Sequence, residues 1–344
     1  MTLPRNFPRH EGVVLVTVIL LAIAVGTINP GFFSFFNIFS LLKNSTIIGL
    51  FAIGFFLVLV VGGLDVSFTS VGVVGMYGTV KLALAFYPDA PFVILFLVAA
   101  LIGAALGLIN GLFVTRLQAP SLIVTLGTMS LYRGFLLYFI GTNWIRQLPS
   151  AMIDFNQMNV LVMTAENGAK VGLHISVAIF VAIVAVVFLV LRYTTLGRSL
   201  YAVGGNPVGA RRMGINVEAV QTLAYCMAGT LAGIAGFLSA VRLSLADPQT
   251  LTGSELDVIA AAVLGGAAIT GGKGSVIGVF LGVLLIVITN DSLIVLGIPA
   301  AWQKVAIGVV LLVAIGMPLL ARGRFTASQL RAGGGLVGVG GASR

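Results

Sequence analysis

Apolar residues follow one another in long runs along this chain, and short polar segments separate the runs. Most runs contain about 17 to 23 residues, and at ~1.5 Å per helical residue that length crosses the ~30 Å hydrocarbon layer of a bilayer. The pattern therefore predicts a set of membrane-spanning helices.

Ten spans are predicted, with boundaries good to a few residues. They cover residues 12–28, 46–62, 66–86, 91–114, 120–141, 171–191, 219–241, 257–271, 275–296 and 303–320. Between the first two, residues 29–45 are interpreted as a loop along the membrane interface. The expected fold is an all-α membrane protein with a single domain over residues 1–324. Residues 325–344 are rich in glycine and are expected to form a disordered tail.

The composition excludes a soluble globular protein. The chain is 59% hydrophobic and 8% charged, whereas charged residues make up about a quarter of a soluble domain. The net charge is +9, but the basic residues are spread among the loops, so no nucleic-acid partner is expected. Most of them fall in segments that are cytoplasmic if both termini are, and most acids fall on the other side. Both termini are therefore predicted to be cytoplasmic.

The longest basic segment between spans is residues 192–218. It contains the signals of a short helix: Asn206 suits the N-cap, and Pro207 suits the first helical position. Gly214 suits a C-terminal cap, and Arg211 lies in the last turn, where the helix dipole favours cations. A bounded helix of about two turns outside the membrane indicates a contact surface for another protein. An ordinary basic cytoplasmic loop is the alternative.

Glycine spacing suggests an internal repeat, although chance spacing is an alternative in a chain with 44 glycines. The repeated residues are Gly103, Gly107 and Gly111 in the fourth span and Gly274, Gly278 and Gly282 in the ninth. Such spacing places glycines on one helix face, where two backbones can approach closely. The preceding span opens with an acid in each half: Asp65 in the first, and Glu255 with Asp257 in the second. Since these spans start on opposite sides, spans 2–5 and 7–10 are expected to be inverted repeats around a path.

Residues for catalysis or metal binding are not apparent in the sequence. The single cysteine, Cys226, and two distant histidines exclude a cysteine-based zinc site or a histidine cluster. The segment 271–275 resembles a phosphate-binding loop, but Ala267 and Gly274 stand where that loop needs glycine and Ser or Thr. We therefore expect no enzyme activity, no catalytic residue, no metal and no cofactor in this chain. The three acids at span starts are interpreted as helix caps rather than catalysts.

Few charges lie within the spans, Arg133 and Asp291 being the clearest. A proton- or sodium-coupled carrier usually needs buried carboxylates or an ion site at a broken helix. Their scarcity, together with the basic cytoplasmic helix, suggests that a partner protein supplies the energy for moving a solute.

Several motifs, in order and at family spacing from about Pro30 to Leu320, resemble the permease subunits of bacterial ATP-binding-cassette importers for simple sugars such as ribose, arabinose, xylose and galactofuranose. They are GGLDVS (62–67), GLING (107–111), TLGR (195–198), YAVGGN (201–206), ELDVIAA (255–261), LGG (264–266) and GGKG (271–274). Leu64 and Val66 depart mildly from the family pattern, which has Ile and Leu there.

The resemblance implies a multi-pass protein of the bacterial inner membrane. It implies three protein partners: a cytoplasmic ATPase that binds ATP and magnesium, a periplasmic solute-binding protein, and a second permease chain that is either identical or a paralogue. The 206–214 helix would be the coupling helix that sits in the ATPase. The expected ATPase-coupling residues are Leu196, Gly197, Arg198, Gly204, Gly205, Asn206, Pro207, Ala210, Arg211 and Gly214. Charge and topology alone suggest Arg146, Lys170 and Arg242 as contacts for the binding protein.

Two alternatives remain open at this point. Permeases for branched-chain amino acids are distant relatives with a similar C-terminal half, so the cargo could be an amino acid or a nucleoside instead of a sugar. A secondary carrier that works without partners is the other alternative. The ELDVIAA and YAVGGN motifs favour the sugar importer.

Overall fold

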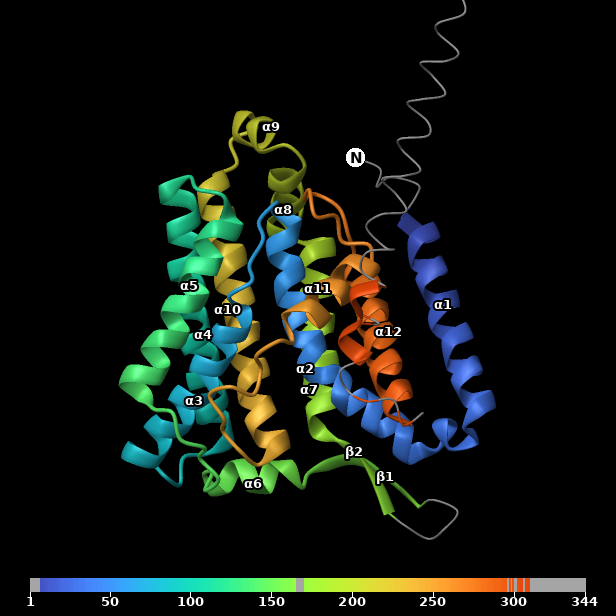
Figure 1. Cartoon of the computed structure of the whole chain (residues 1–344). Coiled ribbons are helices and arrows are strands. Elements are labelled where there is room, and N and C mark those ends of the chain that lie inside the picture. Colours follow the sequence, from blue (N-terminus) through green and yellow to red (C-terminus); the bar gives the residue numbers. More distant parts are fainter. Residues whose placement is uncertain are drawn as a thin grey trace, which may run out of the picture.

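The computed structural model describes residues 7–164, 170–295, 297, 299, 302–305 and 307–309. Helices dominate, and they run mostly side by side in one bundle (Figure 1). The elements are α1 (Phe7–Ile28), η1 (Pro30–Phe33), α2 (Phe35–Val60), α3 (Phe68–Phe86), α4 (Phe92–Leu117), α5 (Ser121–Phe135), η2 (Leu136–Ile140), α6 (Ser150–Asn156), β1 (Asn159–Thr164), β2 (Lys170–His174), α7 (Ile175–Tyr193), α8 (Thr195–Gly205), α9 (Pro207–Arg212), α10 (Val217–Leu243), α11 (Glu255–Leu264) and α12 (Val276–Val295).

Eight helices in the described part of the chain are long and apolar enough to cross a membrane. They are α1, α2, α3, α4, α5 with its π-helical extension η2, α7, α10 and α12. The structure therefore supports a helical membrane protein. The tenth predicted span, 303–320, lies largely outside the described residues, as does the predicted tail over 325–344.

Two predictions about the elements were wrong. The span expected over 257–271 is the ten-residue helix α11, too short to cross a bilayer as a helix, because Gly266 at φ +88° ends it. The expected loop over 29–45 is mostly helix: α2 begins at Phe35, and the Ser34 hydroxyl caps it by accepting from the Asn37 N–H. The chain is mostly helical, as predicted, and the two short strands β1 and β2 pair antiparallel in addition.

The centre of the bundle is formed by α2 and α10. The most apolar 18-residue stretch of each is 83% buried, against 17% for α1. Phenylalanines fill the space between the helices: Phe51 and Phe55 of α2 lie against Phe68 of α3, and Phe237 of α10 lies against Phe92 and Phe96 of α4. A core of this kind fixes the inner helices relative to one another.

Glycines let α4 approach α10 at backbone distance. A Cβ at Gly103 would lie 2.2 Å from the Gly229 carbonyl oxygen, and one at Gly107 would lie 2.3 Å from the Tyr225 carbonyl oxygen. Since real Cβ atoms do not come so close, these positions require glycine in this packing.

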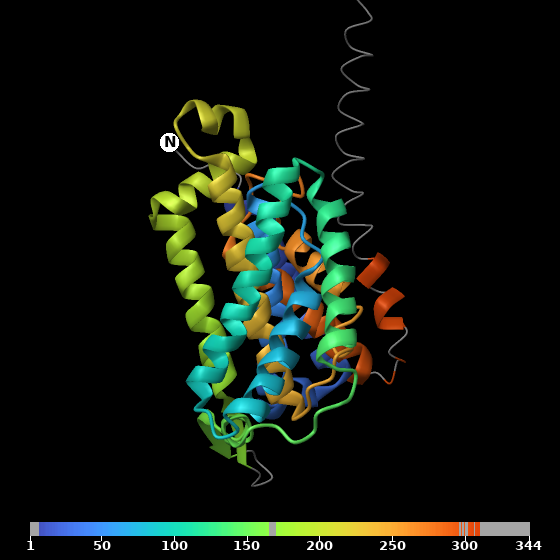
Figure 2. The same cartoon turned by 90° about the vertical axis from the view of Figure 1, so that its left-hand side faces the viewer.

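The two ends of the bundle differ. Helices α8 and α9 project beyond one end, and α6 with the β1–β2 hairpin covers the other (Figure 1). The same arrangement is visible from the side, where α9 stands clear of the ends of α4 and α5 (Figure 2). We refer to these as the α9 end and the α6 end.

Candidate functional site

Two non-helical segments enter the bundle from opposite ends and stop near its middle (Figure 1). Residues 61–67 leave α2 at the α9 end, where Gly62 lies against Gly204 of α8, and lead into α3. Residues 244–254 leave α10 at the α6 end, where Ala246 pairs with Ile145, and lead into α11. The first turns of α3 and α11 thus meet inside the bundle. Interrupted helices that meet in this way often mark a transport path.

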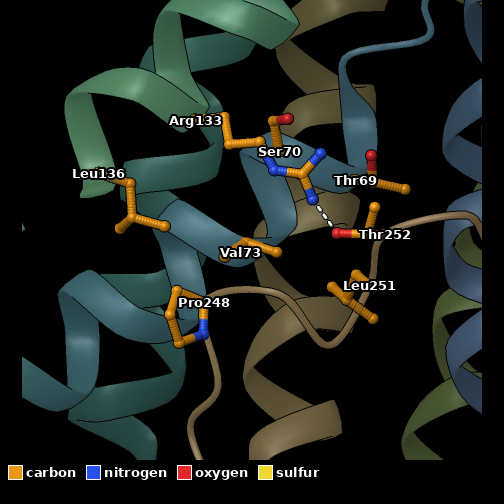
Figure 3. Close-up of a pocket in the computed structure, with 8 residues that line it drawn as sticks. All are labelled: Thr69, Ser70, Val73, Arg133, Leu136, Pro248, Leu251 and Thr252. Carbon is orange, nitrogen blue, oxygen red and sulfur yellow. Dashed lines mark hydrogen bonds between the residues drawn. The ribbon is translucent and has the colours of Figure 1, made fainter. Parts of the chain in front are cut away.

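Two hydrogen bonds attach the start of α11 and the segment before it to α3 and α5. The Thr69 hydroxyl at the start of α3 donates to the Glu255 carboxylate at the start of α11, at 2.7 Å. The Arg133 guanidinium on α5 donates to the Thr252 hydroxyl in the segment before α11 (Figure 3). We call these four residues the crossing site. All of them except Glu255 line a shallow hollow, which is formed by Thr69, Ser70, Val73, Arg133, Leu136, Pro248, Leu251 and Thr252.

A chain of buried hydrogen bonds holds the 61–67 segment. The Ser67 N–H and hydroxyl both donate to Asp65 Oδ1, at 2.8 and 2.6 Å. The Asn110 amide on α4 donates to the Ser67 hydroxyl at 2.7 Å, and the Tyr132 hydroxyl on α5 donates to Asn110 Oδ1 at 2.9 Å. All four side chains are buried, so this network fixes the start of α3 against α4 and α5.

The extended backbone of this segment is satisfied by side chains of α5. The Leu64 N–H donates to the Ser121 hydroxyl at 2.9 Å. The Thr125 hydroxyl accepts from the Val66 N–H at 3.3 Å and lies 3.2 Å from the Leu64 carbonyl. Because backbone groups away from water must find partners, these contacts allow a non-helical segment inside the bundle.

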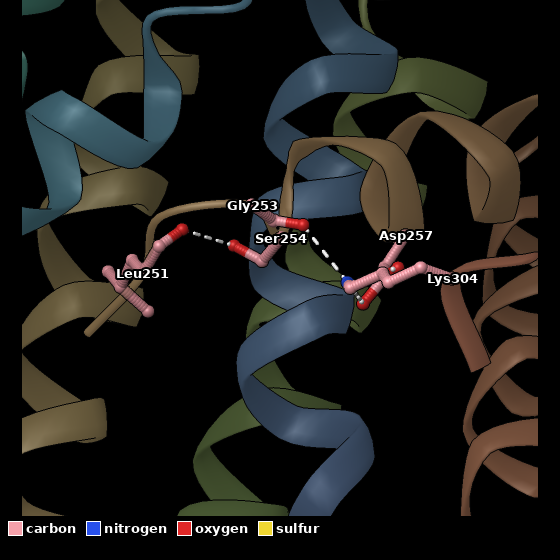
Figure 4. A network of polar contacts seen from close by, with 5 residues as sticks. All are labelled: Leu251, Gly253, Ser254, Asp257 and Lys304. Atoms are coloured by element: carbon pink, nitrogen blue, oxygen red, sulfur yellow. Dashed lines mark hydrogen bonds and ion pairs between the residues drawn. The ribbon is translucent and has the colours of Figure 1, made fainter. Parts of the chain in front are cut away.

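The 244–254 segment has a different set of contacts. Asp247 bonds within its own turn, to the Gln249 N–H at 2.8 Å and the Thr250 hydroxyl at 3.1 Å. Near the start of α11, the Lys304 ammonium donates to the Gly253 carbonyl and to both oxygens of Asp257, each at 3.0 Å (Figure 4). Lys304 therefore holds the end of this segment from a helical stretch beyond α12.

The predicted span-start acids lie at or near these helix starts. Glu255 and Asp257 are the first and third residues of α11. Asp65 lies three residues before α3, so its bond to Ser67 closes a turn ahead of the helix. The contacts of Asn110, Tyr132, Thr252 and Lys304 were not predicted, because only the fold brings these residues together. The motifs GGLDVS and GLING contain Ser67 and Asn110 and were the available signal.

The second predicted glycine ridge is only partly helical. Gly278 and Gly282 lie on α12, where an added Cβ would meet the Gly265 carbonyl at 2.2 Å or the Ala261 carbonyl at 2.0 Å. Gly274 was wrongly placed on this helix: it precedes α12 and has φ +137°. The glycines of α12 thus pack against α11 as those of α4 pack against α10.

Helix α9 has the predicted boundaries and caps. The Asn206 side chain accepts from the Gly209 N–H at 2.9 Å, Pro207 is the first helical residue, and Gly214 has φ +81°. Helix α8, before it, was not predicted. Arg198, Gly205, Asn206, Pro207, Arg211 and Gly214 are exposed, Leu196 and Gly204 are half-buried, and Gly197 and Ala210 are buried.

At the α9 end, glycines let α8 contact the end of α2 and the turn between α11 and α12. A Cβ at Gly204 would lie 1.8 Å from the Val60 carbonyl oxygen and 2.7 Å from the Gly272 nitrogen. The Gly272 N–H donates to that same Val60 carbonyl at 2.9 Å. The Tyr201 hydroxyl donates to the Gly274 carbonyl at 3.0 Å. Burial, with the nearby Glu11 charge, raises the pKa of Tyr201 to about 12, so it remains a donor at neutral pH.

This glycine junction places α8 against the end of α2 and against the turn between α11 and α12. A movement of α9 and α8 would therefore displace the end of α2 and the turn between α11 and α12.

Arg146, Lys170 and Arg242 all lie toward the α6 end. Arg146 and Lys170 are exposed, whereas Arg242 is half-buried and donates to Asn44 Oδ1 at 2.7 Å. Asn44 in turn donates to Asp291 at 3.2 Å. Arg242 is therefore engaged inside the bundle and is less available to a partner than its sequence position suggested.

Comparison with known proteins adds the following. A family model described as the permease component of branched-chain amino acid transport systems matches residues 37–315. The autoinducer 2 import system permease protein of Yersinia enterocolitica is 33% identical over 303 residues, which cover 88% of this chain and 81% of the relative.

Ribose import permease proteins are similar at the same level. The protein from Haemophilus influenzae is 32% identical over 300 residues, covering 87% of this chain and 90% of the relative. The Escherichia coli K12 protein is 31% identical over 301 residues, covering 88% and 91%. No solved structure matches the chain.

Proposed function

The chain belongs to the family of permease components described for branched-chain amino acid transport systems, and on that premise we propose that it forms the path of an importer for a simple sugar. It is a multi-pass inner-membrane protein and the transmembrane subunit of an ATP-binding-cassette importer, not an enzyme. In our proposal a periplasmic binding protein delivers the sugar, and a cytoplasmic partner binds ATP with magnesium and hydrolyses it.

The single observation that carries the coupling role is the form of α9. This short helix stands clear of the bundle (Figures 1 and 2). Its apolar Val208 and the C-cap residue Met213 are 63% and 70% exposed, and Arg211 in its last turn is exposed as well. Exposed apolar side chains next to a cation are typical of a protein contact surface. Through α8, this helix is connected to the end of α2 and to the turn between α11 and α12, which supports placing the ATPase at this end.

The α9 end is then cytoplasmic, and the α6 end faces the binding protein. A second permease chain, identical or paralogous, completes the path in this proposal. Arg146 and Lys170 remain the exposed cations that would meet acidic residues of the binding protein.

The coupling role is tested by Arg211→Glu and Gly205→Glu in the permease assembled with its ATPase and binding protein in proteoliposomes. Each variant places a negative charge on the exposed surface at α9, and we expect ribose uptake to fall at least about tenfold, a loss of ~1.4 kcal/mol of coupling. Membrane insertion should be unchanged, since both residues are exposed. Uptake and ATP hydrolysis are measured together.

The matched control is Arg116→Glu, an exposed arginine in the last turn of α4 that lies outside α8 and α9. It carries the same charge reversal and should transport normally. Normal uptake by both α9-region variants would overturn the coupling role. Uptake by the permease without ATPase would show an autonomous carrier instead.

An amino-acid cargo is the second candidate, and the description of the family model favours it. The relatives at 31–33% identity are named for ribose and autoinducer 2, which favours the sugar. Competition for uptake between labelled D-ribose and unlabelled L-leucine distinguishes the two.

A further inference from the structure

We propose that the crossing site binds the solute during its passage, and that its ligand is a neutral polyhydroxylated molecule. This inference rests on the proposed transport function and deepens it, by naming Thr69, Arg133, Thr252 and Glu255 as the solute contacts inside the path.

The directions of the two hydrogen bonds define the ligand chemistry. Thr69 offers Glu255 a hydroxyl donor at 2.7 Å, and Thr252 offers Arg133 a hydroxyl acceptor. A hydroxyl group both donates and accepts. Two hydroxyls of a sugar can therefore take the places of the two threonine hydroxyls, and every hydrogen bond lost on opening is replaced by one of the same type.

The charges of the site favour a neutral ligand. It holds one carboxylate, Glu255, and one guanidinium, Arg133, each bonded to a threonine hydroxyl and not to the other. An anion would meet Glu255 unfavourably, and a cation would meet Arg133 in the same way. A zwitterionic amino acid would balance both charges, so it is the alternative that the experiment must exclude.

The position of the site joins the two halves of the fold. Thr69 lies in the first turn of α3, and Glu255 begins α11. Thr252 lies in the segment before α11, and Arg133 reaches it from α5 (Figure 3). We call α3 and its neighbours α4 and α5 one half, and the 244–254 segment with α11 the other. Both hydrogen bonds must break for the two halves to separate. A solute that bonds to the same groups stabilises the opened arrangement by its differential binding.

The hollow is closed while the two threonine bonds are formed, and its lining would suit a small polar molecule once they open. Ser70, a residue 4% exposed, adds a hydroxyl, and Val73, Leu136 and Leu251 supply apolar walls. Such a mixture of a few placed polar groups on apolar walls is usual for small-molecule sites.

Thiol protection tests the site directly. Cys226 is the only cysteine, so Cys226→Ser gives a thiol-free background into which Thr252→Cys is introduced. The permease is assembled with its ATPase and binding protein in proteoliposomes and labelled with a small methanethiosulfonate during ATP-driven turnover. The probes are D-ribose as the polyhydroxylated molecule and L-leucine as the zwitterion. Gln249→Cys, also exposed in the same segment but outside the hollow, is the matched control.

We expect D-ribose to slow labelling of Thr252→Cys several-fold and to leave Gln249→Cys unchanged. Protection by L-leucine alone would overturn the ligand class. Equal labelling of both cysteines with and without each probe would overturn the site.

A second measurement separates solute contact from coupling. Glu255→Gln keeps an acceptor for Thr69 but removes the charge, and Thr69→Val removes the hydroxyl at similar volume. Both should lower ribose uptake several-fold while binding-protein-stimulated ATP hydrolysis persists, so more ATP is hydrolysed for each ribose imported. If both variants import ribose normally while Arg211→Glu does not, the crossing site fails and the proposed function stands. If Arg211→Glu also imports normally, the proposed coupling fails.

Discussion

Residues 61–67 enter the bundle from the α9 end and residues 244–254 from the α6 end, and each segment has an aspartate that bonds to the N–H two residues on. The surroundings of these aspartates differ. Asp65 is 3% exposed and belongs to a network that reaches α4 and α5. Asp247 is half-buried and bonds only within its own turn among the described residues.

This difference indicates which of the two segments moves during transport. The first segment has side-chain partners for its backbone at Leu64 and Val66. The second is held by the Ile145–Ala246 pairing at one end, and by Arg133 on Thr252 and Lys304 on Gly253 at the other, where both residues are exposed. Segments with few buried contacts open at lower free-energy cost. We therefore expect α3 to act as the fixed wall of the path and the segment before α11 to move.

The largest expected effect comes from the glycines at which α3 and α11 pack closely against their neighbours. A Cβ at Gly236 would lie 1.9 Å from the Gly72 carbonyl of α3, and one at Gly282 would lie 2.0 Å from the Ala261 carbonyl of α11. We expect Gly236→Ala to cost about 3 kcal/mol by overpacking and Gly282→Ala to cost less, because α11 can shift. Thermal unfolding in detergent measures both.

Gly127→Ala is the control for this pair. Gly127 lies on α5 with nothing within 4 Å of an added Cβ, so alanine should be neutral or slightly stabilising there. An equal loss for Gly236→Ala and Gly282→Ala would remove the distinction between a fixed and a moving half.

The two aspartates give the next largest effect. Asp65→Ala leaves the buried Ser67 N–H and hydroxyl without their acceptor, and we expect a loss of about 2 kcal/mol in unfolding free energy. Asp247→Ala opens a half-buried turn and should cost about 0.5 kcal/mol, since water can replace its bonds. Chemical denaturation in detergent gives both values. A larger loss at Asp247 than at Asp65 would reverse the assignment of the fixed half.

Local signals and tertiary contacts explain what the sequence predicted and what it did not. Helix α9 was predicted because its caps, Asn206, Pro207 and Gly214, act within a few residues of one another. The early end of α11 was missed because the apolar run continues past it. Gly266, whose positive φ ends the helix, lies against His10 of α1, and Gly271 and Gly272 in the following turn lie against Gly204 of α8, so distant contacts accompany the local preference.

The contacts of the non-helical segments 61–67 and 244–254 could not be predicted from the sequence for the same reason. Asp65 and Glu255 were recognised as helix-start acids, but their separate surroundings depend on Asn110, Tyr132 and Lys304, which lie far away in the sequence. The GGLDVS motif is short and apolar residues follow it, so the periodicity continues into α3 without showing the seven residues that are not helical.

The smallest effect on stability, and the most direct test of the moving segment, comes from Lys304→Met. The methionine keeps the length of the side chain but removes the ammonium that bonds to Gly253 and Asp257. The Lys304 side chain is 50% exposed, so we expect a loss of less than about 0.5 kcal/mol in unfolding free energy. Amide hydrogen exchange across 244–254 should nevertheless become faster, because the segment loses its attachment near α11. Lys81→Met, at an exposed lysine of α3 that pairs with no acid among the described residues, should change neither. Exchange that stays slow in Lys304→Met would mean that packing alone holds the segment, and the two halves would then be equally fixed.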